Sequence, residues 1–345
     1  MFQFAQRRKY YFLLSASVII PGIIAMIIST ITYNSPIRLS IDFTGGTIAE
    51  FSFIDNVGEQ QIRDGLANFG LDDIIVQRLD PISTDEISSD VALEPAGSRW
   101  QIRMDNLTDE RLNELKAYLQ ENVSPFWSPQ SETEDPLREA AITTSSVSPT
   151  VGREVTRAAL LATLAVAVII LFFIVWAFRR IPHAFRYGAC AIVAMFHDIL
   201  VTMGVMSILG LLFDWEADAL FLTAILTVVG YSVQDSIVVF DRIRENIPKY
   251  RGESYDTVVN RSVLETIHRS LATQLNAIFV LIAILLFGGE TIQQFIGILL
   301  IGMISGTYSS IFNAVPLLIS WEKGEIPFVN REAKRRRQEE LTVAP

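Results

Sequence analysis

Six long apolar segments constrain the fold of this 345-residue chain more than any other feature of its sequence. A helix needs about 20 mainly apolar residues to cross the hydrocarbon core of a bilayer. The segments that meet this length are about 11–31, 157–178, 187–211, 219–240, 270–287 and 292–320. Half of all residues are hydrophobic and the mean hydropathy is positive. The sequence therefore predicts a multi-pass α-helical membrane protein with six transmembrane helices.

Basic residues are distributed so that they predict the orientation of these spans. They form four clusters, at Arg7–Lys9, 179–186, 242–269 and 334–337. Basic loops and tails stay on the cytoplasmic side of a membrane, and six spans satisfy this rule for all four clusters. We therefore expect a cytoplasmic N-terminus (1–10), a basic cytoplasmic tail (321–345) and an extracytoplasmic head domain (32–150) between the first two spans, with the other five spans within 151–320.

The first apolar segment also has features of a secretory signal peptide, because it follows a basic cluster. At about 20 residues it is longer than the usual signal core, and it lacks a small-x-small cleavage pattern. We predict that 11–31 is a retained membrane anchor.

The block at 32–150 has the pattern of a small α+β domain. Between Tyr33 and Thr150 there are 21 acidic and 8 basic residues. Apolar alternation and helical spacing predict strands at 47–53, 73–79, 99–104 and 140–147, helices at 60–69 and from Thr108 onward, and a loop at 124–136. This β-α-β-β-α-β order is the ferredoxin-like arrangement. We expect one extra strand before it, at about 37–42.

One stretch, Val229–Asn246, places a carboxylate well inside an apolar segment. An acid such as Asp235 costs roughly 2.5–3.5 kcal/mol in the middle of a span. Its small or polar neighbours are Gly230, Tyr231, Ser232, Gln234 and Ser236. The stretch ends in residues that need water or headgroups, namely Asp241, Arg242, Arg244, Glu245 and Asn246. We interpret Asp235 as part of an ion relay or of a polar pairing that fixes the helix bundle.

Other polar residues in the spans give further candidates. His197 and Asp198 lie near the middle of the third span, where the acid is either a relay group or a structural acid paired with the histidine. Arg269, at the start of the fifth span, is either a relay partner of Asp235 or an arginine that extends to the headgroups.

Two further segments have patterns that predict local structure. Gly302, Gly306 and Ser310 form a small-residue stripe on the sixth span, which favours close helix approach. We expect the connection at 247–266 to form a helix along the membrane surface.

The segment IDFTGG follows the first span and contains Asp42, Phe43, Thr44, Gly45 and Gly46. Paired glycines permit positive φ angles, and Asp and Thr side chains bond to nearby amides. The pattern predicts a tight turn that joins the anchor to the head. It is a weak signal for phosphate binding, since no helix follows in the right place.

Several kinds of chemistry lack their motif in this sequence. There is no Walker A loop, so we do not expect ATP hydrolysis. Cys190 is the only cysteine and the three histidines are scattered, so we expect no metal site and no cofactor. The acidic total gives no support for nucleic-acid binding.

Three classes of function fit these residues. The first is a proton-coupled transport or motor protein in which Asp235 titrates with Asp198 or Arg269 as partners. The second is an intramembrane aspartyl hydrolase that uses two acids, for which the GxGD signature is absent. The third is a non-transporting scaffold that docks other membrane proteins through its head.

Four motifs resemble the SecD/SecF family of protein-export membrane proteins, in its SecF branch, which is related to the RND transporters. They are DFTGG at 42–46, SVSPTVG at 146–152, HD at 197–198 and GYSVQDSIVVFDRIREN at 230–246. The resemblance covers almost the whole chain. The sequence departs from the usual family residue at Ser40, Ser148 and Gln234, which are commonly Gly, Gly and Asn.

The resemblance implies a prokaryotic inner-membrane protein that is not an enzyme. It implies a heterocomplex with SecD, association with the SecYEG channel, and indirect association with SecA and with YidC and YajC. The substrate would be unfolded preprotein outside the membrane, moved by the proton-motive force after the SecA-driven step. Proton passage would involve Asp235 and Arg269. An RND-type proton-coupled transporter of small solutes is the alternative.

These implications lead to a mechanistic hypothesis. Protonation of Asp235 at the interface with SecD changes the packing of the fourth span. The change then reaches the head through the DFTGG and SVSPTVG segments. Proton flow can bias the head only if its two conformations differ in proton affinity at the buried site.

Overall fold

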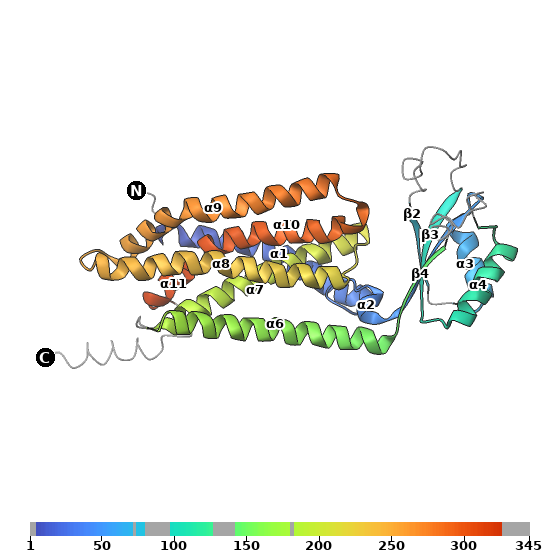
Figure 1. Ribbon diagram of the computed structural model, residues 1–345, viewed down its shortest axis with the longest axis horizontal. Coiled ribbons are helices and arrows are strands. Elements are labelled where there is room, and N and C mark those ends of the chain that lie inside the picture. Colours follow the sequence, from blue (N-terminus) through green and yellow to red (C-terminus); the bar gives the residue numbers. More distant parts are fainter. Residues whose placement is uncertain (1–4, 72–73, 80–96, 127–141, 180–182, 326–345) are drawn as a thin grey trace, which may run out of the picture. The chain divides into compact units, whose positions relative to one another are not determined.

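The computed structural model describes residues 5–71, 74–79, 97–126, 142–179 and 183–325 (Figure 1). These residues form two compact units. A helical unit combines Met1–Arg38 with Ala159–Pro345, and a head unit comprises Leu39–Ala158.

The helical unit contains the predicted membrane spans. Its elements are η1 (Ala5–Arg7), α1 (Arg8–Tyr33), α6 (Pro149–Ala177, which begins in the head unit), α7 (Ala184–Phe213), α8 (Ala219–Lys249), α9 (Tyr255–Phe287), α10 (Glu290–Ser309), η3 (Ser310–Ala314) and α11 (Val315–Glu322). Six helical segments of the described chain are long and apolar enough to cross a membrane, and the last of them joins α10, η3 and α11. The prediction of a six-span helical membrane protein is confirmed.

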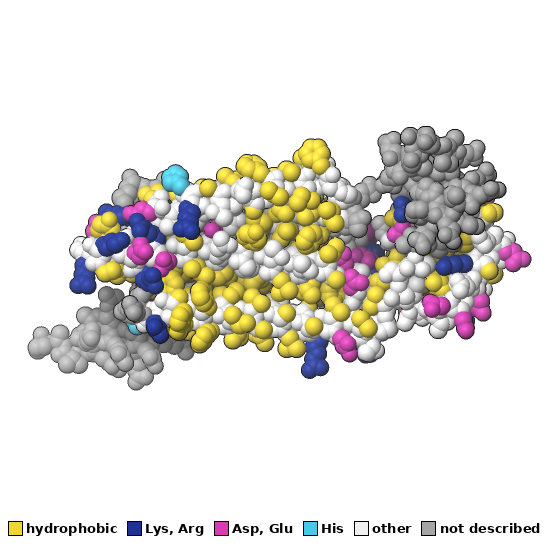
Figure 2. Space-filling model, viewed as in Figure 1, with side chains coloured by type: hydrophobic (Ala, Val, Ile, Leu, Met, Phe, Trp, Pro, Cys, Tyr) yellow, Lys and Arg dark blue, Asp and Glu magenta, His cyan; other side chains and the backbone are white. Residues whose placement is uncertain are grey.

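Charged and apolar side chains are separated along this unit. Figure 2 shows hydrophobic side chains along the length of the helices, with a dense cluster of Lys, Arg, Asp and Glu at one end and further acidic side chains at the other. The start of α1, the end of α11 and the α8–α9 connection meet at the end with the dense cluster. Arg8 pairs with Glu325, and Lys323 pairs with Asp256, each at 2.5 Å.

The segment 247–266 is helical over most of its length, as predicted, but it does not form a helix of its own. Residues up to Lys249 continue α8, and residues from Tyr255 onward already belong to α9. The Ser254 hydroxyl accepts a hydrogen bond from the Thr257 amide, and Val259 in the next turn is buried. Residues from Tyr255 onward are therefore the first turns of the fifth helix, because the helix is capped at Ser254 and buries an aliphatic side chain in the next turn.

Small residues let the central helices approach closely. A Cβ atom on Gly22 of α1 would lie 2.9 Å from the Gly204 Cα of α7. A Cβ atom on Gly302 of α10 would lie 2.2 Å from the Val228 Cγ2 of α8. Real Cβ atoms do not come so close to other atoms, so glycine is required for these contacts.

The head unit is an α+β domain with a four-stranded antiparallel sheet. Its elements are α2 (Ile41–Thr44), β1 (Gly46–Phe53), α3 (Glu59–Asn68), β2 (Ile75–Leu79), β3 (Ser98–Met104), α4 (Asp109–Asn122) and β4 (Ile142–Val147). The strand order is β2-β3-β1-β4. This order and the β-α-β-β-α-β succession confirm the predicted ferredoxin-like arrangement.

The core of the head is an apolar cluster between the sheet and its two helices. Phe51 of β1 pairs with Trp100 of β3, and both are buried. The Thr108 hydroxyl caps α4 through the Arg111 amide, and this helix buries Leu112, Leu115 and Leu119. Most of the predicted loop at 124–136 lies outside the described residues.

The predicted extra strand at 37–42 was wrong. Residues Ile41–Thr44 form one helical turn, α2, in which the Gly45 amide donates to the Ile41 carbonyl at 2.8 Å. The Thr44 hydroxyl donates back to the Ser40 carbonyl. Gly45 (φ +76°) and Gly46 (φ +128°) then redirect the chain into β1. Local hydrogen bonds and two glycines at positive φ outweigh the strand propensity of the preceding residues.

Candidate functional site

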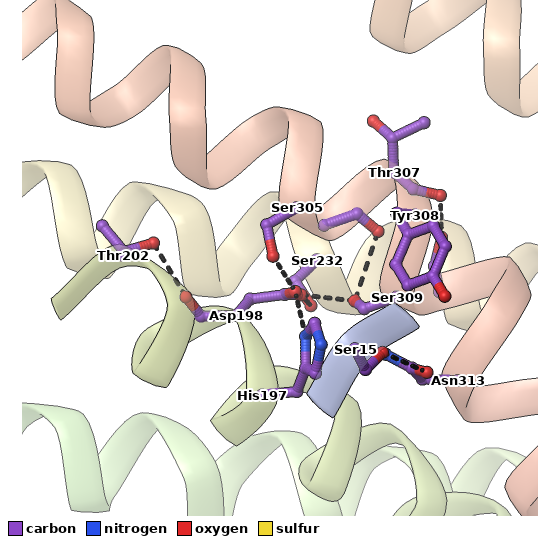
Figure 3. Close-up of polar contacts among 12 residues, drawn as sticks. Ser15, His197, Asp198, Thr202, Ser232, Ser305, Thr307, Tyr308, Ser309 and Asn313 are labelled. Carbon is purple, nitrogen blue, oxygen red and sulfur yellow. Dashed lines mark hydrogen bonds and ion pairs between the residues drawn. The ribbon is translucent and has the colours of Figure 1, made fainter. Parts of the chain in front are cut away.

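Helix α8 carries polar groups that contact buried partners on two neighbouring helices. The first site contains Asp198 of α7, whose side chain is fully buried. Three serine hydroxyls donate to its carboxylate: Ser232 of α8 at 2.5 Å, Ser305 of α10 at 2.7 Å and Ser309 of α10 at 2.5 Å (Figure 3). We call Asp198 with these three serines and His197 the Asp198 node. It joins three helices through one carboxylate.

His197 completes the node. Its Nδ1 atom lies 3.0 Å from the Asp198 carboxylate. Its Nε2 atom is buried and has no hydrogen-bond partner among the described residues. The ring lines a cavity of about 370 Å³ between α1, α7 and α10, together with Ser15, Ser305 and Tyr308. Both oxygens of the Asp198 carboxylate therefore have hydrogen-bond partners. Within the node, the His197 Nε2 atom is the one that lacks a described partner.

The π-helical segment η3 follows directly on the node. The Ser309 hydroxyl bonds to Asp198, and the Asn313 amide oxygen accepts from the Ser15 hydroxyl of α1 at 2.9 Å (Figure 3). A π turn shifts the helical register by one residue, and such turns are frequent at functional sites. This turn lies between the residues that contact α7 and α1.

Asp235 forms a second, separate site on α8. Its side chain is 3% exposed, and its Oδ2 atom accepts a hydrogen bond from the Gln274 amide of α9 at 2.9 Å. The hydroxyl of Ser270, one turn before Gln274, is buried beside it. Among the described residues no hydrogen bond or ion pair joins Asp235 to Asp198 or to Arg269. The structure therefore does not bring the two predicted acids into one site.

The outward face next to Asp235 is polar although it lies within two candidate spans. On α8, Gly230 and Gln234 are exposed, and on α9 Arg269, Thr273 and Asn276 are exposed. A Cβ atom on Gly230 would meet nothing within 4 Å. Polar side chains on an outward face of a span are costly in hydrocarbon, so this face has the composition of a surface that meets another protein or water.

The charged end of the α8 motif ties neighbouring helices together. Arg242 donates to Glu265 of α9 at 2.6 Å, and Asn246 donates to the same carboxylate at 2.8 Å. Arg244 pairs with Asp241 and donates to the Ala177 carbonyl at the end of α6. These motif residues therefore connect α8 to α9 and α6.

The two glycine-containing motifs of the head unit are packed against each other. A Cβ atom on Gly45 would lie 2.6 Å from the Pro149 Cα, and one on Gly152 would lie 2.6 Å from the Phe43 carbonyl oxygen. The α2 turn thus contacts the first turn of α6 directly, and glycine is needed on both sides of the contact.

Residues to which the sequence assigned no role complete these sites. Ser305 and Ser309 donate to Asp198, and Gln274 donates to Asp235. The spacing of four between Ser305 and Ser309 places both on one helix face. At the other end of the unit, buried Arg38 pairs with Asp214 and Glu216 in the α7–α8 connection.

The fold and the site define a class: a helical membrane protein with a ferredoxin-like head after its first span and buried acids in its central helices. The family model for the C-terminal region of the protein export membrane proteins SecD and SecF matches residues 130–324. SecF of protein translocase from Thermobaculum terrenum is 40% identical over 322 residues, which are 93% of this chain and 94% of the relative. SecF from Anaerolinea thermophila is 39% identical over 92% of this chain and 94% of its own length.

A solved structure gives the same result. The chain is similar to SecDF, a translocon-associated membrane protein from Thermus thermophilus, with a TM-score of 0.69 and 28% identity. The match covers 93% of this chain and 39% of that longer one. The chain belongs to the SecD/SecF family of protein export membrane proteins, and its full-length relatives are SecF subunits of protein translocase.

Proposed function

We propose that this chain is the SecF subunit of a SecDF complex that uses the proton-motive force to advance preprotein translocation. The observation that carries the proposal is Asp235: among the described residues its buried carboxylate accepts one hydrogen bond, from the Gln274 amide, and it lies beside the buried Ser270 hydroxyl and an outward polar face on α8 and α9. A buried acid with few partners can change its protonation and its contacts at low cost, unlike one held by many donors. Asp235 is therefore the proposed proton-coupling group.

Arg269 is the proposed electrostatic partner of Asp235. It lies one residue before Ser270, whose side chain is buried beside Gln274, the partner of Asp235. The Arg269 side chain is exposed in this single chain. We propose that SecD covers the outward polar face and brings a proton path to Asp235 between the two subunits.

We also propose roles for the remaining motif residues. His197 and Asp198 take part in coupling through the Asp198 node, which holds α7, α8 and α10 together. Gly302 and Gly306 let α10 approach α8 so that Ser305 and Ser309 reach the node. Ser310 continues this small-residue stripe.

The contact between the DFTGG turn and the start of α6 is the proposed route to the head. Both motifs rely on glycines whose replacement would force backbone atoms apart. A movement of α6 would therefore act on β1 and β4 through these motifs.

The proposed setting is the cytoplasmic membrane of a prokaryote, with both termini inside and the head outside. Proposed partners are SecD, the SecYEG channel, and SecA, YidC and YajC indirectly, with translocating preprotein as the substrate. The relatives are named as translocase subunits, so we assign no catalytic activity and no cofactor to the chain. The alternative is a non-transporting scaffold or a small-solute transporter of the RND type.

The test compares proton flux and preprotein export in inverted vesicles that contain this chain and SecD. Asp235→Asn should abolish gradient-driven export and the associated flux while the complex still assembles. Thr223→Val is the matched control, because Thr223 is an exposed polar residue of the same helix whose hydroxyl donates to the Ala219 carbonyl one turn earlier. It should leave both activities unchanged. Normal export by Asp235→Asn would favour the scaffold.

A further inference from the structure

A second cavity of the helical unit is unrelated to the buried acids. It has a volume of about 660 Å³ and lies where the start of α1, the first turns of α9 and η3 meet. Its lining consists of Arg7, Tyr10, Tyr11, Asn260, Val263, Leu264, Ile267 and Phe312. A volume of this size is typical of a ligand site.

The walls of this cavity are apolar and aromatic. Val263 is 2% exposed, and Leu264 beside it is 41% exposed and faces the open side. The Phe312 ring is fixed by an edge contact with Tyr11 at 4.9 Å and a stacked contact with Tyr308 at 5.1 Å. The cavity therefore offers a preformed hydrophobic surface.

The polar edge of the cavity carries one positive charge. Among the described residues, no carboxylate forms an ion pair with Arg7, whereas the adjacent Arg8 is bonded to Glu325 at 2.5 Å. The described residues of the lining include no acidic side chain. A net anionic headgroup would meet the Arg7 guanidinium, with no described carboxylate competing for it. A zwitterionic headgroup also carries an ammonium, which could contact only the aromatic rings of the lining.

The position of the cavity along the helices matches the boundary of a bilayer. Arg7 directly precedes the candidate span Arg8–Tyr33, and Tyr10 is exposed in its first turn. Tyr residues favour the headgroup layer, where one end of the ring is apolar and the other is polar. Basic pockets at this depth between spans bind anionic headgroups in membrane proteins.

We propose that this cavity binds an anionic phospholipid, with the phosphate at Arg7 and an acyl chain against Val263, Leu264 and Phe312. The site is independent of the proposed export function, so either can fail without the other. It would fix the start of α1 against α9 through the lipid.

The test uses the full-length chain in detergent, with native mass spectrometry after addition of dioleoyl phosphatidylglycerol or dioleoyl phosphatidylcholine. The wild type should retain phosphatidylglycerol in preference to phosphatidylcholine. Arg7→Gln should weaken phosphatidylglycerol retention about fivefold. Lys9→Gln is the matched control, because Lys9 is exposed and lies outside the lining, and it should retain the lipid as the wild type does.

A second pair of variants tests the acyl part of the site. Leu264→Trp fills the open side of the cavity and should reduce retention of phosphatidylglycerol without any change in charge. Leu271→Trp, at an exposed position two turns further along α9, should not. Equal retention of the two lipids by the wild type, or equal losses in Arg7→Gln and Lys9→Gln, would show only diffuse surface attraction and overturn the proposal.

Discussion

The two buried acids of the bundle differ in how many hydrogen bonds their carboxylates accept. Asp198 is fully buried and receives hydrogen bonds from Ser232, Ser305 and Ser309 in addition to its contact with His197. Asp235, which lies one helical turn from Ser232 on α8, accepts one hydrogen bond among the described residues, from the Gln274 amide, with the Ser270 hydroxyl buried beside it. One acid therefore accepts hydrogen bonds from hydroxyls on two other helices, and the other accepts a single amide bond beside an outward polar face.

This difference indicates a division of roles. A carboxylate held by several charge-assisted bonds is rigid, since any movement must break all of them together. A carboxylate with one neutral partner can exchange that partner or gain a proton with little rearrangement. We infer that Asp198 positions α7, α8 and α10, while Asp235 senses protons.

The largest change in the free energy of unfolding is expected when each of the two acids is replaced by leucine. Asp198→Leu leaves three hydroxyls and an imidazole without their acceptor and should lower the free energy of unfolding by about 3–5 kcal/mol. Asp235→Leu leaves the Gln274 amide without its acceptor and should lower the free energy of unfolding by about 1–3 kcal/mol. Thermal unfolding of both variants in the same detergent measures this contrast. Equal losses would remove the distinction between the two sites.

A smaller change in the free energy of unfolding is expected when a glycine that lets α10 approach α8 is replaced by alanine. Gly302→Ala would place a Cβ atom 2.2 Å from Val228, and such overpacking typically costs about 1–3 kcal/mol. Gly230→Ala on the open face of α8 is the control and should stabilise the helix by up to about 1 kcal/mol. The same unfolding measurement applies. A neutral Gly302→Ala would mean that the node does not depend on this close approach.

The smallest effect is expected at the polar face beside Asp235. Arg269→Lys keeps the charge and loses the planar guanidinium fork, so gradient-driven export should fall in part while the unfolding temperature stays unchanged. Export assays with SecD in vesicles measure this. Wild-type export by Arg269→Lys would show that this residue only extends to the headgroups.

The sequence was sufficient to predict the spans and most of the head. Apolar length predicts membrane helices because the bilayer sets that length, and Thr108 with three spaced leucines predicts α4 because caps and helical faces are local signals. The segment at 37–42 was misread as a strand because the α2 turn depends on hydrogen bonds to Ser40 and on the two following glycines.

The partners of the acids could be predicted only in part. Asp198 and Asp235 stand out because an acid within an apolar segment is rare. Ser305 and Ser309 do not stand out, since a serine in a span often bonds only to its own helix. The pairing of Asp235 with Gln274 depends on how α8 packs against α9, which no local pattern specifies.

Infrared spectroscopy of the carboxyl groups tests this division of roles most directly. The complex with SecD would be followed through the C=O stretch of protonated carboxylic acids as the pH is varied, in the wild type, Asp235→Asn and Asp198→Asn. We predict a pH-dependent band that disappears in Asp235→Asn and persists in Asp198→Asn. A band that is lost in Asp198→Asn and retained in Asp235→Asn would contradict the assignment of Asp235 as the proton-coupling group.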